Sequence, residues 1–178
     1  MERQIESGES LTPSKEFLAY SHYKLFEQYW PRLQQCVKPL TRGQMWWRPN
    51  SASNSIGNLL LHLSGNVRQW LVASFNGEND ERNRPAEFSR TDGADGIDPL
   101  AELAATMEEA EKVLRRLSES DLMKIYSIQG FTVSGLGAVY QVVEHFGLHY
   151  GQIVYITKML TAEDLGFYKE LSKTGRAG

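Results

Sequence analysis

Apolar residues recur every three or four positions along four stretches of this chain, and that spacing predicts amphipathic helices. The clearest pattern covers residues 100–117, where apolar side chains form one face and charged side chains fill the other. Residues 13–37, 56–75 and 136–160 show similar patterns, although Pro31 is expected to kink or break the first of them. Four such segments predict an all-α fold, a four-helix bundle in which each apolar face turns inward.

The segments between these helices are polar and contain many turn-forming residues. A connection is predicted over residues 38–55. It contains the Trp46-Trp47 pair, which would either line the mouth of a pocket or pack in the core. Residues 125–133 alternate in character and predict a short hairpin before the last long helix. A final short helical segment is predicted over residues 162–171.

The longest connection, residues 76–97, crosses between the second and third helices. A connection of this length within one domain is uncommon and often functional, for example as a lid over a site. Its charged and aromatic side chains would either anchor it or contact a substrate, and a solvated charged loop is the favoured interpretation. The residues concerned are Arg82, Arg84, Glu87 and Phe88.

A polar stripe runs along the last predicted helix, which is otherwise apolar. Its members recur at spacings of four, four and three residues and therefore share one helix face. They are Gln141, His145, His149 and Gln152. A similar line on the second helix joins His62 to Asn58 and Asn66, each one turn away. Buried polar groups cost free energy unless they have partners, so both stripes need an explanation.

Two histidines one helical turn apart can direct their lone pairs at a single ion, so His145 and His149 form a competent half of a metal site. In a four-helix bundle the second and fourth helices can face each other, which allows His62 to complete a site of three imidazoles. Zn, Ni, Cu and Fe all suit imidazole ligands. The alternative is that these histidines are core residues that hydrogen-bond to buried carbonyl groups.

Other polar residues would play smaller parts at this site. The four amide side chains of the two stripes would orient the imidazoles through hydrogen bonds. Glu144 lies about 100° round the helix from His145 and is expected to pair elsewhere. His22 lies on the apolar face of the first helix, where a hydrogen-bonded core histidine is favoured over a pocket residue. Cys36 is expected to be a packed thiol and not a ligand or nucleophile.

Chain length, charge and cysteine content favour some classes of protein and argue against others. The 178 residues suit a single domain over residues 1–178, with residues 1–12 as a disordered tail. The net charge of −3 and the lack of a basic run argue against nucleic-acid binding, and no apolar run is long enough to span a membrane. A single cysteine and a charged N-terminus favour a cytoplasmic location.

Two blocks around these histidines resemble the DinB-like superfamily. They are NSIGNLLLHLSGN at 54–66 and EHFGLHYGQI at 144–153, while RPAEF at 84–88 and EDLGFY at 163–168 resemble a bacterial branch of that superfamily. The resemblance extends over most of the chain and implies an up-down-down-up bundle, often a homodimer, with one divalent metal ion. By position, the metal ligands would be His62, His145 and His149.

The resemblance also implies an activity. Characterised members include bacillithiol-type transferases and a mycothiol-dependent maleylpyruvate isomerase, in which a metal activates a low-molecular-weight thiol. We therefore predict a metal-dependent thiol transferase acting on a small-molecule substrate, with Zn or Ni favoured and Fe or Mn as alternatives. Substrate groups would come from residues 76–97, the Trp46-Trp47 pair and His22. The alternatives are a metal-dependent hydrolase and a non-catalytic metal- or ligand-binding bundle of the stress response.

Overall fold

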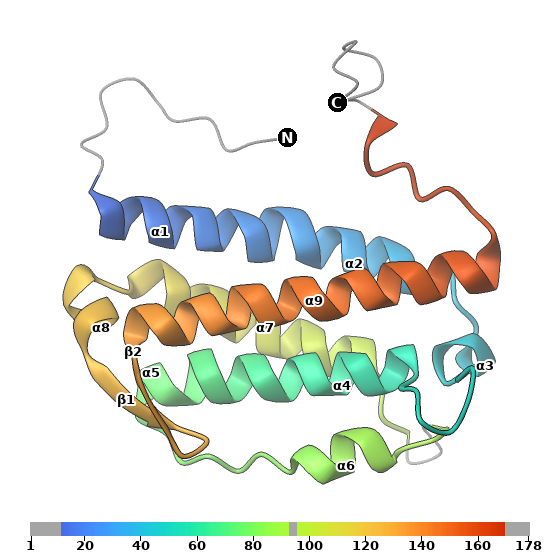
Figure 1. Ribbon diagram of the computed structural model, residues 1–178, viewed down its shortest axis with the longest axis horizontal. Helices are drawn as coiled ribbons and strands as arrows, with labels where there is room; N and C mark the ends of the chain where they lie inside the picture. Colours follow the sequence, from blue (N-terminus) through green and yellow to red (C-terminus); the bar gives the residue numbers. More distant parts are fainter. Residues whose placement is uncertain (1–11, 93–95, 170–178) are drawn as a thin grey trace.

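Four helical rods form the core of the protein in the computed structural model, which describes residues 12–92 and 96–169 (Figure 1). The rods are α1 (Pro13–His22) continued by η1 (Tyr23–Tyr29) and α2 (Trp30–Val37), α4 (Ile56–Val67) continued by η2 (Arg68–Ala73) and α5 (Ser74–Asn76), α7 (Pro99–Arg116) and α9 (Gly135–Thr161). The segments η1 and η2 are π-helical. The predicted all-α four-helix bundle is confirmed. Except for Thr12, which caps α1, the tail predicted at residues 1–12 lies outside the described residues.

The first rod and α9 run in one direction through the bundle, and α4 and α7 run in the other, as Figure 1 shows. This is the up-down-down-up order that the resemblance implies. Because the second and third rods are parallel, the chain must travel the length of the bundle between them. Residues 77–98 make this crossover and carry α6 (Arg84–Ser89), which packs against α4. The long crossover agrees with the prediction, whereas a helix within it was not predicted.

Short elements complete the connections. They are α3 (Arg42–Met45), α8 (Glu119–Met123), β1 (Ile125–Ile128) and β2 (Phe131–Ser134). The strands pair in antiparallel fashion, so the predicted hairpin is confirmed, and its turn residues Gln129 and Gly130 have φ values of 52° and 79°. The helical segment predicted over residues 162–171 is wrong for residues 162–168, because Ala162 ends α9 in the left-handed conformation with a φ of 55°.

The first rod changes its helical geometry near Pro31, although it does not break. Pro31 lies in the first turn of α2, and residues 23–29 just before it wind as a π-helix. A proline ring clashes with the carbonyl group one turn earlier, so a wider turn lets the rod continue past it. Tyr29, the last residue of this segment, stacks on Phe146 of α9 with ring centroids 6.3 Å apart and ties the rod to the last helix.

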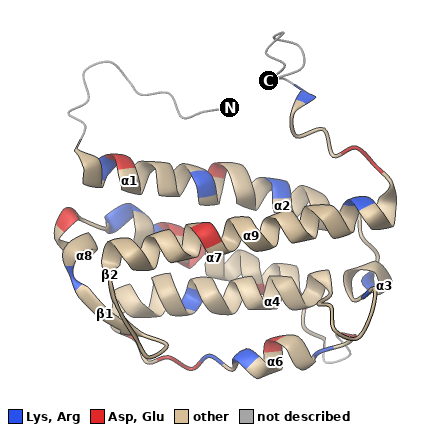
Figure 2. Cartoon of the chain, viewed as in Figure 1, with Lys and Arg blue, Asp and Glu red and all other residues tan. Residues whose placement is uncertain are grey.

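Charge is almost absent from the two helices that meet at the centre of the bundle. α4 contains no Lys, Arg, Asp or Glu, and α9 contains only Glu144 and Lys158, so both are largely tan in Figure 2. α4 is buried because α6, α7 and α9 pack around it. The fully buried apolar side chains include Leu60, Leu63, Leu103, Met107 and Phe146. No helix among the described residues combines the length and the apolar character of a membrane span.

Cys36 packs in the core, as expected, and is fully buried. Burial raises the pKa of its thiol to about 11, so the thiolate that alkylation requires is scarce at about pH 8. We predict that iodoacetamide at that pH leaves the native protein unmodified and labels the single thiol in urea, as intact mass would show. Rapid labelling of the native protein would mean that the end of the first rod opens to solvent.

Gly135 allows the start of α9 to lie against α8. A Cβ atom at this position would overlap the backbone oxygen of Asp121, whereas one at Gly137 would meet nothing closer than the Ser134 hydroxyl at 3.4 Å. We predict that Gly135→Ala lowers the free energy of unfolding by roughly 1–3 kcal/mol through overpacking, and that Gly137→Ala is neutral or slightly stabilising. Urea unfolding measures both variants. Equal stabilities would show that a backbone shift relieves the overlap.

Candidate metal centre

Three histidines from two neighbouring helices converge inside the bundle, and we call them the histidine triad. His62 is buried on α4, while His145 and His149 are half-buried and lie one turn apart on α9. The ring centroid of His62 lies 5.0 Å from that of His145 and 5.0 Å from that of His149, and the last two are 4.5 Å apart. One ligand nitrogen from each residue lies within 4.8 Å of the other two. The two polar stripes thus meet, as the sequence predicts.

Hydrogen bonds of the triad indicate which ring nitrogen is free to bind a ligand. His62 Nδ1–H donates to Glu87 Oε2 at 2.8 Å, and His149 Nδ1–H donates to Gln152 Oε1 at 2.7 Å. In a neutral imidazole this arrangement leaves the lone pair on Nε2. The Nε2 atoms of His62 and His145 lie 2.9 Å apart, so both point into the same small volume.

The donor set fits a divalent metal ion. Zinc–imidazole bonds of about 2.0–2.1 Å in tetrahedral geometry separate two ligand nitrogens by about 3.3 Å. The 2.9 Å contact and the 4.8 Å outer limit of the triad bracket that distance, so small ring rotations suffice. Burial lowers the pKa of His145 to about 4, with the charges of His149 and His62 acting in the same direction, and burial also lowers the pKa of His149. Both rings are therefore neutral near neutral pH, the form that binds metals.

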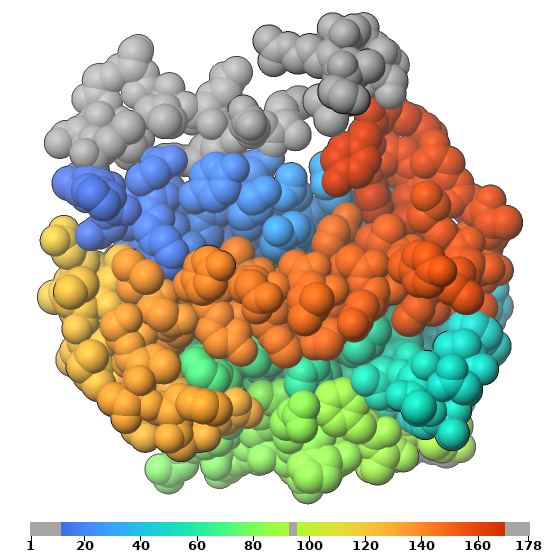
Figure 3. Space-filling model, viewed as in Figure 1, coloured from blue at the N-terminus to red at the C-terminus, as the bar shows by residue number. Residues whose placement is uncertain are grey.

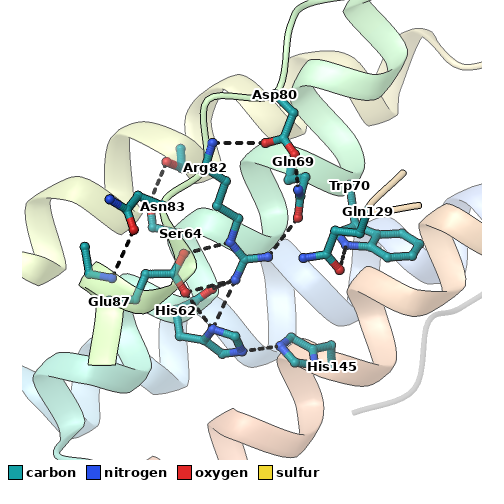
Figure 4. A network of polar contacts seen from close by, with 12 residues as sticks. His62, Ser64, Gln69, Trp70, Asp80, Arg82, Asn83, Glu87, Gln129 and His145 are labelled. Atoms are coloured by element: carbon teal, nitrogen blue, oxygen red, sulfur yellow. Dashed lines mark hydrogen bonds and ion pairs between the residues drawn. The ribbon is translucent and has the colours of Figure 1, made fainter. Parts of the chain in front are cut away.

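A buried ion pair holds His62 in place (Figure 4). Arg82 donates from Nε to Glu87 Oε1 at 2.7 Å and from Nη2 to Glu87 Oε2 at 3.0 Å. The side chains of Arg82, Glu87 and His62 are only 5%, 10% and 4% exposed. Burial acts to raise the pKa of Glu87, but the hydrogen bonds from His62 and Arg82 hold it below its usual value. Glu87 is thus an ionised carboxylate that accepts a hydrogen bond from Nδ1–H of His62 and fixes its tautomer.

The interpretation of Arg82 and Glu87 as solvated loop residues is therefore wrong. Their burial follows from α6, which begins after the N-cap Asn83 with a proline in its first turn and lays Glu87 against His62. That cap and proline form a helix-start signal that is visible in the sequence. Gln69 of η2 accepts a hydrogen bond from Arg82 Nη1 at 2.9 Å, which ties the crossover to the second rod.

The amide side chains nearest the triad have different roles. Gln152 contacts His149, as predicted. The predicted contact between Asn58 and an imidazole is wrong, because Asn58 Nδ2 instead donates to the backbone oxygens of Glu87 and Arg90, each at 2.9 Å. Asn58 therefore fixes α6 on the second rod and acts on the triad only through the position of Glu87.

Asn66 lies one turn after His62, and Gln141 lies one turn before His145. Their side-chain oxygens are buried, and neither has a hydrogen-bond partner within the part of the chain that the structure describes. The predicted bonds to the imidazoles are not formed. Buried amide oxygens without a donor cost free energy, so these two are acceptors that a polar ligand group beside the triad would satisfy.

Other candidate residues lie outside the triad. His22 Nε2 lies 2.8 Å from Glu111 Oε1, which matches the interpretation as a hydrogen-bonded histidine of the first rod. Trp46 is 9% exposed and covers Gly57, where a Cβ atom would stand 2.9 Å from the indole ring, so Trp46 is a core residue. Glu144 is exposed on α9 and is not part of the triad.

An up-down-down-up bundle whose second and fourth rods bring three histidines together has the architecture of a DinB-like protein. The structure is similar to that of a conserved protein from Enterococcus faecalis, with a TM-score of 0.67 and 15% identity over 82% of this chain and 97% of that one. A DinB-like protein from Bacillus cereus matches with a TM-score of 0.61 and 14% identity over 82% of this chain and 91% of that one. These likenesses show the DinB-like fold.

Within that class, the chain belongs to the family described as Protein of unknown function (DUF1572), whose sequence profile matches residues 13–172. A comparison with curated proteins finds no match. The fold and the three converging histidines are therefore the features from which a function must be argued.

Proposed function

We propose that this protein is a metal-dependent enzyme that activates a low-molecular-weight thiol for attack on a small electrophile. His62, His145 and His149 would hold the divalent ion, with zinc or nickel favoured. The observation that carries the proposal is the convergence of three imidazoles, with no fourth protein ligand in that cluster among the described residues. Structural zinc sites use four protein ligands, whereas catalytic sites keep one position for water or substrate.

The residues around the triad suit an anionic nucleophile. A bound divalent ion would lower the pKa of a thiol or water that it holds. Because imidazoles bind a metal in their neutral form, three histidine ligands would leave the charge of the ion uncompensated, and an anionic ligand such as a thiolate is favoured. Glu87 and Gln152 hold two of the rings through Nδ1, which keeps their Nε2 atoms directed inward. The Phe88 ring, 4.7 Å from that of His62, keeps water from this side.

Hydrolysis by a bound water is the second candidate, and one observation disfavours it. Attack by water calls for a general base near the reacting oxygen. The carboxylate that touches the triad, Glu87, already accepts hydrogen bonds from Arg82 at both oxygens and from His62 at Oε2. A thiol is far more acidic than water, so a bound thiol loses its proton without a base more readily than a bound water does, and thiol transfer fits these residues better.

Metal content and ligand exchange test the proposal. Protein purified without an affinity tag should contain about one zinc or nickel ion per chain by elemental analysis. In the cobalt-substituted protein, an added thiol should change the visible spectrum because it enters the open position. Transfer of that thiol to an aryl chloride should then be measurable and should depend on the metal.

Three other results would each overturn the proposal. If the protein contains no metal and binds none on titration, the three histidines are hydrogen-bonded core residues and not metal ligands. A metal whose spectrum no thiol alters would indicate a closed site and a non-catalytic metal-binding bundle. Ester hydrolysis without thiol transfer would favour the hydrolase.

A further inference from the structure

Two arginines near the start of α6 differ sharply in their surroundings. Arg82 is buried, and its guanidinium is saturated by Glu87 and Gln69. Arg84 is exposed, and among the described residues its guanidinium has no carboxylate or carbonyl partner. It does contact an aromatic ring, since the guanidinium carbon lies 5.1 Å from the centroid of Phe88. Arg84 is thus a cation that the described part of the protein orients but does not neutralise.

This cation lies at the edge of the triad. Arg84 and Phe88 are four residues apart on α6 and share one helix face. The Phe88 ring in turn packs against His62, with the two ring centroids 4.7 Å apart. Phe88 therefore stands between the guanidinium and the triad.

The surface around this edge shows how a ligand would enter. In Figure 3 the orange α9 and the light-green segment that holds α6 flank the part of α4 that reaches the surface. The triad joins α4 to α9, and Phe88 of α6 covers one side of it. An approach from solvent to the half-buried His145 and His149 therefore runs between α6, which carries Arg84, and α9.

We propose that Arg84, held in place by Phe88, binds a carboxylate group of the small molecule that reaches the triad. A guanidinium presents a planar fork that matches the two oxygens of a carboxylate. Stacking on Phe88 fixes the fork before the ligand arrives, which reduces the entropy lost on binding. The inference rests on the proposed function, and it specifies that the substrate or the thiol is anionic at a second position.

The other charges nearby do not replace Arg84 in this role. The charge of Arg82 is offset by Glu87, with which it forms a bidentate pair. Glu144 is exposed on α9 next to His145, so its charge opposes an incoming anion. Substitution of Glu144 by Gln should therefore strengthen binding of a carboxylate slightly, whereas substitution of Arg84 should weaken it more.

Three thiols of similar size but different charge test this inference on the cobalt-substituted full chain. Mercaptopropionate carries a carboxylate, mercaptoethanol is neutral and cysteamine is cationic, and each is titrated against the visible spectrum of the metal. Comparison of affinity ratios between proteins cancels the differences in thiol acidity. The ratio of mercaptopropionate to mercaptoethanol affinity should fall by roughly 10-fold in Arg84→Gln and less in Arg84→Lys, because Lys keeps the charge but lacks the fork.

Metal content and a second arginine supply the controls. Arg84→Gln should bind cobalt as the wild type does, since Arg84 touches no ligand of the ion. Arg115→Gln removes the same charge from α7, where Arg115 is exposed and pairs with Glu111 at 2.7 Å, and it should leave the ratio unchanged. A matched pair of electrophiles, chloronitrobenzoate and its methyl ester, shows whether the carboxylate belongs to the electrophile instead. In that case Arg84→Gln raises the KM of the acid alone.

The outcomes separate the two proposals. If thiols bind but neither their ratio nor the acid–ester preference changes in Arg84→Gln, the role of Arg84 is wrong and the proposed function stands. If no thiol alters the spectrum of the wild-type cobalt protein, the proposed function fails and the role of Arg84 fails with it. The role of Arg84 is supported if Arg84→Gln lowers either the thiol affinity ratio or the acid–ester preference and Arg115→Gln lowers neither.

Discussion

The His149→Ala variant is expected to retain no metal ion after dialysis, while the wild-type protein retains about one per chain. Three imidazoles are the ligands that the described residues contribute to the proposed site, so the loss of one removes a third of them. The loss of one of three ligands should lower the affinity by roughly 100-fold or more, which lets dialysis against a chelator remove the ion. Competition with a chromophoric chelator measures this change directly.

The fold should survive the His149→Ala substitution. His149 is half-buried, and its hydrogen bond is to Gln152 on the same helix, so no hydrogen bond between rods depends on it. His22→Ala is the matched control, because it removes a hydrogen-bonded histidine of the first rod that does not belong to the triad. It should keep the metal. Stoichiometric metal in His149→Ala, or loss of metal in His22→Ala, would show that the triad is not the site.

Local pattern in the sequence was sufficient to locate the triad. The spacing of His145 and His149 places both on one helix face wherever that helix packs. His62 could be assigned to the same site because buried polar side chains on an apolar helix need polar partners, and the polar stripe of a neighbouring helix provides them. The up-down-down-up order of the rods follows from the resemblance to DinB-like proteins, and this order requires the long connection to lie between the second and third rods. The helices and the length of that connection depend only on periodicity and spacing, which a single sequence contains.

The support of the triad could not be predicted in the same way. Arg82 and Glu87 lie in a polar segment, and polar segments are usually solvated. Their burial arises only when the crossover folds back along α4 and Asn58 binds the backbone of α6. That contact joins residues about thirty positions apart, so it cannot be predicted from a local sequence pattern. The end of α9 could not be predicted either, because the left-handed conformation of Ala162 ends the helix and apolar periodicity does not indicate it.

Glu87→Gln is expected to have the second largest effect, on both metal affinity and stability. The substitution keeps the shape of the side chain but removes the charge that offsets Arg82 and accepts the His62 proton. Loss of such a partner to a metal-binding histidine lowers metal affinity by about 10–100-fold. Removal of one member of a buried ion pair costs roughly 3–5 kcal/mol, because the other charge is left without a partner. Chelator competition and urea unfolding measure the two effects.

An exposed ion pair provides the matched control. Arg68 and Glu109 also form a bidentate pair, at 3.0 and 3.1 Å, but their side chains are 46% and 47% exposed. Glu109→Gln should therefore change stability by less than about 1 kcal/mol and leave metal affinity unchanged. Similar losses in Glu87→Gln and Glu109→Gln would mean that the buried network contributes nothing particular to the site.

The pH dependence of stability gives an independent test of Glu87. Its pKa is lowered in the folded protein, so its stabilising contribution is fully present above the ordinary value of 4.5 and is lost as the pH falls through the lowered value. The wild-type protein should lose this contribution in acid, whereas Glu87→Gln lacks it at every pH. The difference in unfolding free energy between the two should therefore shrink below about pH 4.5.

A double variant separates the structural role of Glu87 from its role at the triad. Arg82→Met combined with Glu87→Gln removes the uncompensated charge, so most of the stability lost in Glu87→Gln should return. Metal affinity should stay low, because the carboxylate that accepts the His62 Nδ1 proton is still absent. Recovery of both properties would show that Glu87 serves only to neutralise Arg82. Recovery of stability alone would show that the carboxylate of Glu87 acts on the metal site through His62.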